Sequence, residues 1–157
     1  MIRLMQVFKD SPYIVDICYL ITKYSALIFG EYVNPIEVFL EGLMQKKIVV
    51  IGAFKRQELI AFLVLYNFQK ISHDNFNCYI YGASIRGNAA ILDFSMNYIF
   101  EDLKLNGCNV IRFETKEYNM PMRKMANRLG FNKISILHNT CSINGKYRNS
   151  ILYEKIL

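Results

Sequence analysis

The chain has 157 residues, of which 53% are hydrophobic, and it carries a formal net charge of +6. This length fits one domain, residues 1–157, and the apolar fraction is ample for a sizeable core, which excludes a disordered chain. The longest apolar runs, 47–54 and 58–68, fall well short of the roughly 20 residues that a membrane-spanning helix needs. We therefore expect a soluble, cytoplasmic protein with no membrane partner.

The residue types that bind metals or form disulfides are few and scattered. Cys18, Cys78, Cys108 and Cys141 lie far apart and form no C-x-x-C pair, and the only histidines are His73 and His138. We expect neither a metal site nor a disulfide framework. The basic residues occur in ones and twos, so the positive charge favours acidic partners in general but marks no binding patch.

In chain order, the apolar spacing predicts a strand, two helices, three strands, a helix, a strand, a helix and two strands. The expected bounds are 2–8, 13–29, 36–46, 47–54, 58–68, 76–84, 88–106, 109–115, 120–129, 131–139 and 148–157. This order predicts a mixed α+β domain with helices on both faces of a sheet. The segment 76–115 is expected to form a right-handed parallel crossover.

The crossover makes the turn 82–89 a candidate anion site. It places that turn at the carboxyl end of a strand and the amino end of a helix, where main-chain N–H groups lack helical partners. A second interpretation is purely structural: Gly87 and Asn88 begin the helix, and Asn88 caps it.

The element order resembles that of the GCN5-related N-acetyltransferases (GNAT), and three segments carry the resemblance. IGAFKRQELIAFLVL resembles the first central hairpin of the family. SIRGNAAIL occupies the place of the pyrophosphate-binding turn, Q/R-x-x-G-x-G/A, and NMPMRKMANRLGF that of N-x-x-A-x-x-L-Y-E-K-L-G-F. The resemblance implies a central, mostly antiparallel, twisted sheet with one parallel crossover, and acetyl-CoA as cofactor.

The resemblance also implies which residues bind the cofactor. The turn contributes Ser84, Ile85, Arg86, Gly87, Asn88 and Ala89. We prefer the alignment in which Gly87 and Ala89 take the G and G/A positions of the motif and Ser84 replaces its Gln or Arg. In the other alignment Arg86 is the first residue of the motif, and Ala89 and Ile91 take the two small positions. Asn119 corresponds to the asparagine that hydrogen-bonds the pantetheine arm, and it is equally suited to cap a helix. Arg123 is expected to reach the ribose phosphate.

The residues for proton transfer depart from the family pattern. Ala126 stands where the family has the tyrosine that protonates the leaving thiolate. Water, Tyr118 or Tyr147 could donate that proton instead, or else the protein does not catalyse the reaction. The base position of the lysine-acetylating branch falls near Asp74, in His73-Asp74, so the carboxylate or the imidazole is a candidate proton acceptor. A purely structural loop between strands would also explain these residues, and ordered water can act as the base instead.

The predicted function is an acetyl-CoA-dependent N-acetyltransferase that moves an acetyl or short acyl group to a primary amine. The acceptor is a small molecule, a protein lysine or an aminoacyl group, the last through a charged tRNA. The alternative is a catalytically degenerate binding module on the same fold. The sequence leaves open a monomer or a homodimer.

Overall fold

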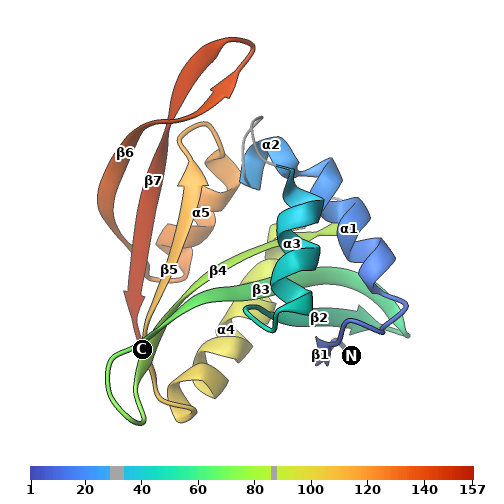
Figure 1. Cartoon of the computed structure of the whole chain (residues 1–157). Coiled ribbons are helices and arrows are strands. Elements are labelled where there is room, and N and C mark those ends of the chain that lie inside the picture. The colour runs from blue at the N-terminus through green and yellow to red at the C-terminus, as the bar shows by residue number, and fades with distance from the viewer. Residues whose placement is uncertain (29–33, 86–87) are drawn as a thin grey trace.

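The computed structural model describes residues 1–28, 34–85 and 88–157. The strands are β1 (Arg3–Val7), β2 (Val49–Lys55), β3 (Glu58–Lys70), β4 (Phe76–Ser84), β5 (Cys108–Lys116), β6 (Asn132–Ile143) and β7 (Lys146–Ile156). The helices are α1 (Ile14–Lys23), α2 (Ser25–Ile28), α3 (Pro35–Met44), α4 (Ala89–Leu105) and α5 (Met120–Arg128). Figure 1 shows their arrangement.

The strands form one seven-stranded sheet in the order β1-β2-β3-β4-β5-β7-β6. Every neighbouring pair is antiparallel except β4 and β5, which run parallel. The predicted hairpin over 47–68 is the β2–β3 pair, and the predicted parallel connection over 76–115 is β4–α4–β5. The expected mixed α+β fold, mostly antiparallel with one parallel crossover, is confirmed.

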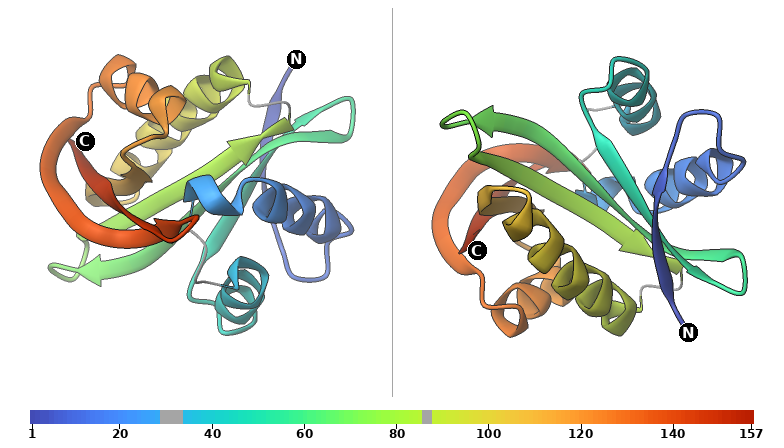
Figure 2. Two further views of the ribbon diagram at one scale, coloured as in Figure 1. Left: turned by 90° about the horizontal axis from the view of Figure 1, so that it is seen from above. Right: turned by 90° about the horizontal axis from the view of Figure 1, so that it is seen from below.

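Helices cover both faces of the sheet, as expected (Figure 2). On one face α1 and α3 bury Ile21 and Phe39 against Phe62 of β3. On the other face α4 and α5 bury Met96 and Met125 in a larger core. Burial of whole apolar side chains on both faces is the main stabilisation of such a sheet. No helix in the described part of the chain is long and apolar enough to span a membrane.

One predicted helix is in fact two. The sequence predicts a continuous helix over 13–29, but α1 ends at Lys23 and the separate α2 follows within the described residues. Tyr24 caps α1 with its N–H directed to the carbonyls of Leu20 and Thr22. The apolar spacing continues through this break, so periodicity alone could not reveal it. The break turns the α2 segment toward the middle of the sheet.

Several helix ends follow the predicted capping signals. Asn34, Asn88 and Asn119 each cap a helix by accepting a main-chain N–H with the side chain. Gly107 and Gly130 follow α4 and α5 with positive φ angles of 87° and 74°, a conformation that favours glycine. These local signals fix where α4 and α5 begin and end.

The parallel pair separates halfway along its length, which is the feature that creates the site. β4 and β5 are in register only from Phe76 opposite Cys108 to Tyr79 opposite Arg112. Beyond that point β4 stays paired with β3 as far as Ser84, and β5 stays paired with β7 as far as Lys116. Because each strand follows its outer neighbour, the two diverge and leave a gap within the sheet (Figure 1).

Candidate active site

A cleft of about 240 Å³ fills the gap between the diverging strands. Its lining comes from the open ends of both strands, from the start of α4, from α5 and from the α1–α2 corner, and it is mostly apolar. The lining residues include Tyr24, Leu27, Ile80, Tyr81, Gly82, Ala83, Ser84, Ala89, Leu92, Phe113, Glu114, Thr115, Asn119, Met122 and Met125. The cleft is therefore built by segments from four regions of the sequence.

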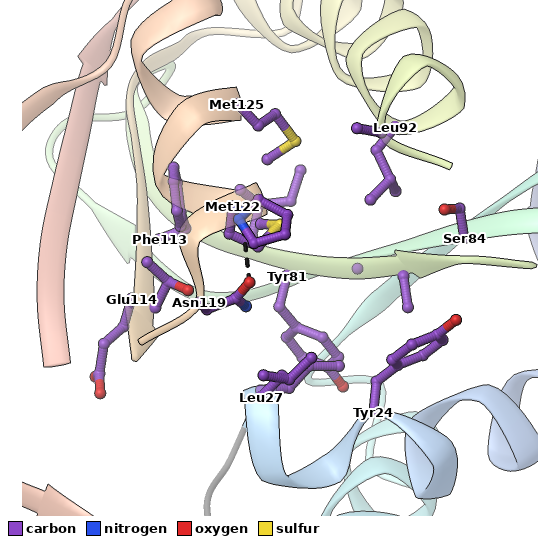
Figure 3. Close-up of a pocket in the computed structure, with 17 residues that line it drawn as sticks. Tyr24, Leu27, Tyr81, Ser84, Leu92, Phe113, Glu114, Asn119, Met122 and Met125 are labelled. Atoms are coloured by element: carbon purple, nitrogen blue, oxygen red, sulfur yellow. Dashed lines mark hydrogen bonds between the residues drawn. The ribbon is translucent and has the colours of Figure 1, made fainter. Parts of the chain in front are cut away.

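The cleft passes through the sheet from one face to the other. Figure 3 shows Leu92 and Met125 on the α4–α5 side of β4, and Tyr24 and Tyr81 on the opposite side. A second cavity of about 440 Å³ lies on the α1–α3 face and shares Glu114 and Tyr81 with the cleft. Two reactants could therefore approach from opposite faces and meet beside Glu114.

The start of α4 is joined to the end of β4 by side-chain hydrogen bonds. The buried hydroxyl of Ser84 donates to the carbonyl of Asn88 at 2.9 Å, and Asn88 Oδ1 accepts the N–H of Ala90 at 3.1 Å. Ile85 is half-buried, and Ala89 lines the cleft. The main-chain N–H groups of the first turn lie at the positive end of a 17-residue helix, where the helix dipole favours an anion.

Two residues of the predicted phosphate turn, Arg86 and Gly87, lie outside the described residues. Their predicted contacts to phosphate stay predictions. In the described part of the turn, Ser84 and Ala89 line the cleft, and Ile85 and Asn88 are their neighbours in the chain. Both interpretations of Asn88 are compatible here, since a helix cap and an anion site use different N–H groups.

Asn119 is brought to the cleft and Arg123 is not. The side chain of Asn119 is buried in the wall of the cleft and caps α5 by accepting the N–H of Met122 at 3.4 Å (Figure 3). Its amide group is thus fixed where a pantetheine arm would pass. Arg123 instead turns back, donating to the carbonyl of Glu117 at 3.0 Å, and it does not line the cleft.

Asp74 lies at the other end of β4. It belongs to the β3–β4 connection, its side chain is 87% exposed, and its partner is the Nδ1 atom of His73 at 2.8 Å. Ten residues separate Asp74 from Ser84, a distance on the order of 30 Å at about 3.3 Å per extended residue. The cleft lies at the carboxyl end of β4, whereas Asp74 precedes the amino end of that strand. The structure therefore does not bring Asp74 to the cleft.

Glu114 is the carboxylate that the sequence reasoning missed. It lies on β5 between the buried residues Phe113 and Thr115, and its side chain is 36% exposed where the two cavities meet. Lys116 donates to Glu114 Oε1 at 3.3 Å and to Ser150 Oγ at 3.0 Å. The single carboxylate in the predicted strand NVIRFET was the available signal.

Tyrosine hydroxyls are present in the cleft although the family position is not a tyrosine. Ala126 is fully buried in the core. Tyr118 donates its hydroxyl to the carbonyl of Ala26 at 2.6 Å, whereas Tyr147 is exposed and does not line the cleft. Tyr24 and Tyr81 do line it. Burial, with smaller contributions from Tyr66 and Cys18, raises the pKa of Tyr81, so its hydroxyl keeps its proton at physiological pH.

Thr115 gives an independent test of whether the cleft suits a ligand such as acetyl-CoA. It is 2% exposed and lines the cleft, and its hydroxyl has no hydrogen-bond partner within the described residues. Buried polar atoms rarely lack a partner, so this hydroxyl is suited to a polar group of a ligand. The open edge of β4 adds main-chain groups, and the apolar lining matches the methylene runs of a pantetheine arm. The described residues contain no cluster of acidic, histidine and cysteine side chains that could hold a metal.

Comparison with known proteins finds similarity in structure but not in sequence. No family model matches the chain, and no curated protein matches it. An N-acetyltransferase from Staphylococcus aureus Mu50 aligns with a TM-score of 0.77 and 16% identity, over 99% of this chain and 97% of the other. A ribosomal-protein-alanine N-acetyltransferase from Brucella melitensis aligns with a TM-score of 0.78 and 13% identity, over 99% of both chains.

A third solved structure contains a ligand. Arabidopsis thaliana NAA60 in complex with acetyl-CoA aligns with a TM-score of 0.72 and 16% identity, over 100% of this chain and 99% of the other. At such low identity, alignments over whole chains establish a common fold. Together with the strand order and the diverging parallel pair, they show that this chain has the fold of the GCN5-related N-acetyltransferase superfamily.

Proposed function

We propose that the chain is an acetyl-CoA-dependent N-acetyltransferase, which transfers an acetyl or short acyl group to a primary amine. The observation that carries this proposal is the gap between β4 and β5, a mostly apolar cleft that crosses the sheet and meets a second cavity at Glu114. The names of the three solved structures support it, because each is an N-acetyltransferase or was crystallised with acetyl-CoA.

In this proposal the diphosphate of acetyl-CoA binds at the amino end of α4, at the main-chain N–H groups of residues 85–89. The pantetheine arm enters the gap, pairs with the open edge of β4 and contacts Asn119 and Thr115. Arg123 is not assigned a contact, because its guanidinium is directed to Glu117. The thioester then lies beside Glu114, facing the second cavity.

Glu114 is the base in the proposed reaction. The amine arrives protonated through the second cavity and gives up a proton to the carboxylate, directly or through an ordered water. The amine nitrogen forms a bond to the thioester carbonyl carbon, the carbon–sulfur bond breaks, and the nitrogen loses its second proton while the thiolate gains one. Water or the hydroxyl of Tyr24 or Tyr81 gives its proton to the thiolate and takes up the one that the nitrogen loses, because Ala126 has none to give.

The proposal is tested first by binding and then by turnover. Acetyl-CoA at about 100 times its Kd should stabilise the fold by about 2.7 kcal/mol, seen as a rise in melting temperature. Release of CoA, followed with a thiol reagent over an amine panel that includes peptides, then reports transfer. Absence of a melting shift at millimolar acetyl-CoA would contradict the proposal, and binding without turnover on any amine would favour the binding module instead.

The non-catalytic binding module is the second candidate, because Ala126 is buried at the family's tyrosine position and has no proton to donate. For the cellular location we propose the cytoplasm, because Cys18, Cys78, Cys108 and Cys141 are all free thiols, as expected in a reducing compartment.

A further inference from the structure

We propose that the acceptor is the amino-terminal segment of a polypeptide, whose α-amine reaches Glu114 while its next residues lie in a groove between α3 and β3. This inference rests on the proposed acetyl transfer and names its substrate class. The groove, called here the acceptor groove, is formed by two adjoining cavities lined by Ile28, Val38, Phe39, Glu41, Gly42, Gln45, Lys46, Lys47, Ile48, Tyr66, Asn67, Phe68, Tyr81, Glu114, Lys116 and Thr140.

The two cavities of the acceptor groove adjoin each other. The inner one, of about 440 Å³, begins at Glu114. The outer one, of about 600 Å³, extends to the carboxyl end of α3. Val38, Ile48 and Tyr66 line both, so the two cavities meet at these three side chains. An acceptor bound at Glu114 therefore has a route to solvent along α3.

The length of this path favours an acceptor longer than a small amine. From Glu114 on β5 the groove crosses β4 to Tyr66 on β3, and neighbouring strands lie about 4.8 Å apart, or more where β4 and β5 diverge. The crossing is therefore at least about 10 Å, which corresponds to roughly three extended residues. A small amine would fill the inner cavity and leave the outer one unused.

The outer cavity lies beside a sheet edge, and an extended polypeptide can form main-chain hydrogen bonds with such an edge. The described pairs between β2 and β3 end at Val49 opposite Leu65. Beyond Tyr66 the register of β3 with β4 is also interrupted as far as Gln69, and Asn67 has a φ of 49°. On its β2 side this β3 segment thus has no described strand partner, and an extended chain could add there as a strand.

The side chains along the groove suit a peptide as well. Val38, Ile48 and Phe68 provide apolar contacts, whereas Glu41 and Lys47 at the outer end provide charges of both signs. An apolar path with a polar rim is typical of sites that bind extended polypeptide segments. At the inner end, Glu114 Oε1 accepts from Lys116, and the other carboxylate oxygen is left to accept a hydrogen bond from the α-amine.

The first experiment measures how transfer depends on acceptor length. Unblocked peptides of one to six residues, with amidated carboxyl ends, are compared by CoA release at saturating acetyl-CoA. We expect kcat/KM to rise at least about tenfold from one residue to four and then to level off. A one-residue amide that equals the tetrapeptide would overturn the inference in favour of a small amine. A faster reaction of an N-blocked peptide containing lysine would overturn it in favour of a lysine side chain.

The second experiment compares two phenylalanines of similar exposure. Phe68 lines the outer cavity and is 42% exposed, and Phe94 of α4 lies outside the groove and is 46% exposed. Phe68→Ser should lower kcat/KM for the tetrapeptide about fivefold but leave the one-residue amide unchanged, while Phe94→Ser should change neither. Equal losses in both variants would contradict the assignment of Phe68.

A third measurement uses the unmodified protein, so it does not depend on how the variants fold. Tetrapeptides methylated on the main-chain nitrogen of the third or fourth residue lose a hydrogen-bond donor, and at least one of them should react about fivefold more slowly than the parent. Parent-like rates for both would exclude main-chain pairing. Transfer confined to small amines would refute only this inference, whereas failure to bind acetyl-CoA would refute the proposed function itself.

Discussion

The two halves of β4 have the same outer neighbour and opposite roles. From Phe76 to Tyr79 the strand pairs with β3 on one side and β5 on the other, and its thiol Cys78 is buried 3.8 Å from that of Cys108. From Ile80 to Ser84 only the β3 side is paired, and the other edge faces the cleft. One strand thus supplies both a closed, structural half and an open half suited to a ligand.

The difference between these halves shows which part of such a sheet can bind a ligand. Pairing satisfies main-chain groups and leaves nothing for a ligand, whereas separation exposes an edge that must be satisfied in another way. At the open half the neighbouring strand contributes Glu114 and the unpartnered hydroxyl of Thr115. Substitutions at the open half should therefore change binding and turnover, and those at the paired half should change stability.

The largest expected effect is on turnover at the open half. Glu114→Gln should lower kcat by about 10²- to 10⁴-fold with acetyl-CoA binding unchanged, because the amide cannot accept the proton of the amine. Steady-state CoA release and calorimetry measure the two quantities. Glu154→Gln on the adjacent β7, where the carboxylate pairs with Arg112, is the matched control and should keep its kcat. Full activity of the Glu114 variant would assign the base elsewhere.

The second largest effect is a loss of stability from a substitution next to the paired half of β4. Gly107 has a φ of 87°, and a Cβ there would lie 2.0 Å from the carbonyl oxygen of Asp74. Gly107→Ala should lower the free energy of unfolding by about 2–4 kcal/mol through backbone strain and overlap, with an unchanged Kd for acetyl-CoA. Gly145→Ala, at a φ of 72° with no atom within 4 Å, should cost only about 1 kcal/mol. Denaturant unfolding distinguishes the two, and equal losses would contradict the crowding at Gly107.

A smaller effect should separate two helix caps. Asn119→Ala and Asn34→Ala each remove a capping side chain and should each cost about 1 kcal/mol of stability. Only Asn119 lies in the cleft, so only its loss should weaken acetyl-CoA binding, by about fivefold. Calorimetry on both variants makes the comparison. If Kd changes equally in both, the effect of Asn119 is purely structural.

The smallest effect is expected at the far end of β4. Asp74→Asn removes an exposed carboxylate remote from the cleft, and kcat/KM should stay within about twofold of the unsubstituted protein. A loss of tenfold or more in a CoA-release assay would restore Asp74 as the base, contrary to the geometry of the strand.

Local signals in the sequence predicted the elements well because each has a local physical cause. Among the residues that the structure describes, the period-two and helical patterns located the strands and four of the five helices, and Asn88 and Asn119 marked helix starts. The break at Tyr24 was missed, since the apolar pattern does not change there. It depends on packing of the α1–α2 corner against the sheet.

The candidate site was predictable only in part. The phosphate turn and Asn119 belong to contiguous motifs, so the resemblance could assign them residue numbers, and their contacts to a cofactor stay predictions. Glu114 comes to the cleft only because β5 leaves β4 after Arg112, a long-range event that no local pattern records. Asp74 was proposed by counting along β4 without knowing which half of the strand is open. Arg123 was placed correctly on α5, but the direction of its side chain is set by the carbonyl of Glu117.

The most direct test is a crystal structure of the protein with acetyl-CoA. We expect the diphosphate at the amino end of α4 and the pantetheine arm between Ile80–Ser84 and Phe113–Thr115. The thioester carbonyl carbon should then lie within reach of an amine held at Glu114. A structure in which acetyl-CoA binds outside this gap, or in which β4 and β5 pair along their whole length in its presence, would contradict it.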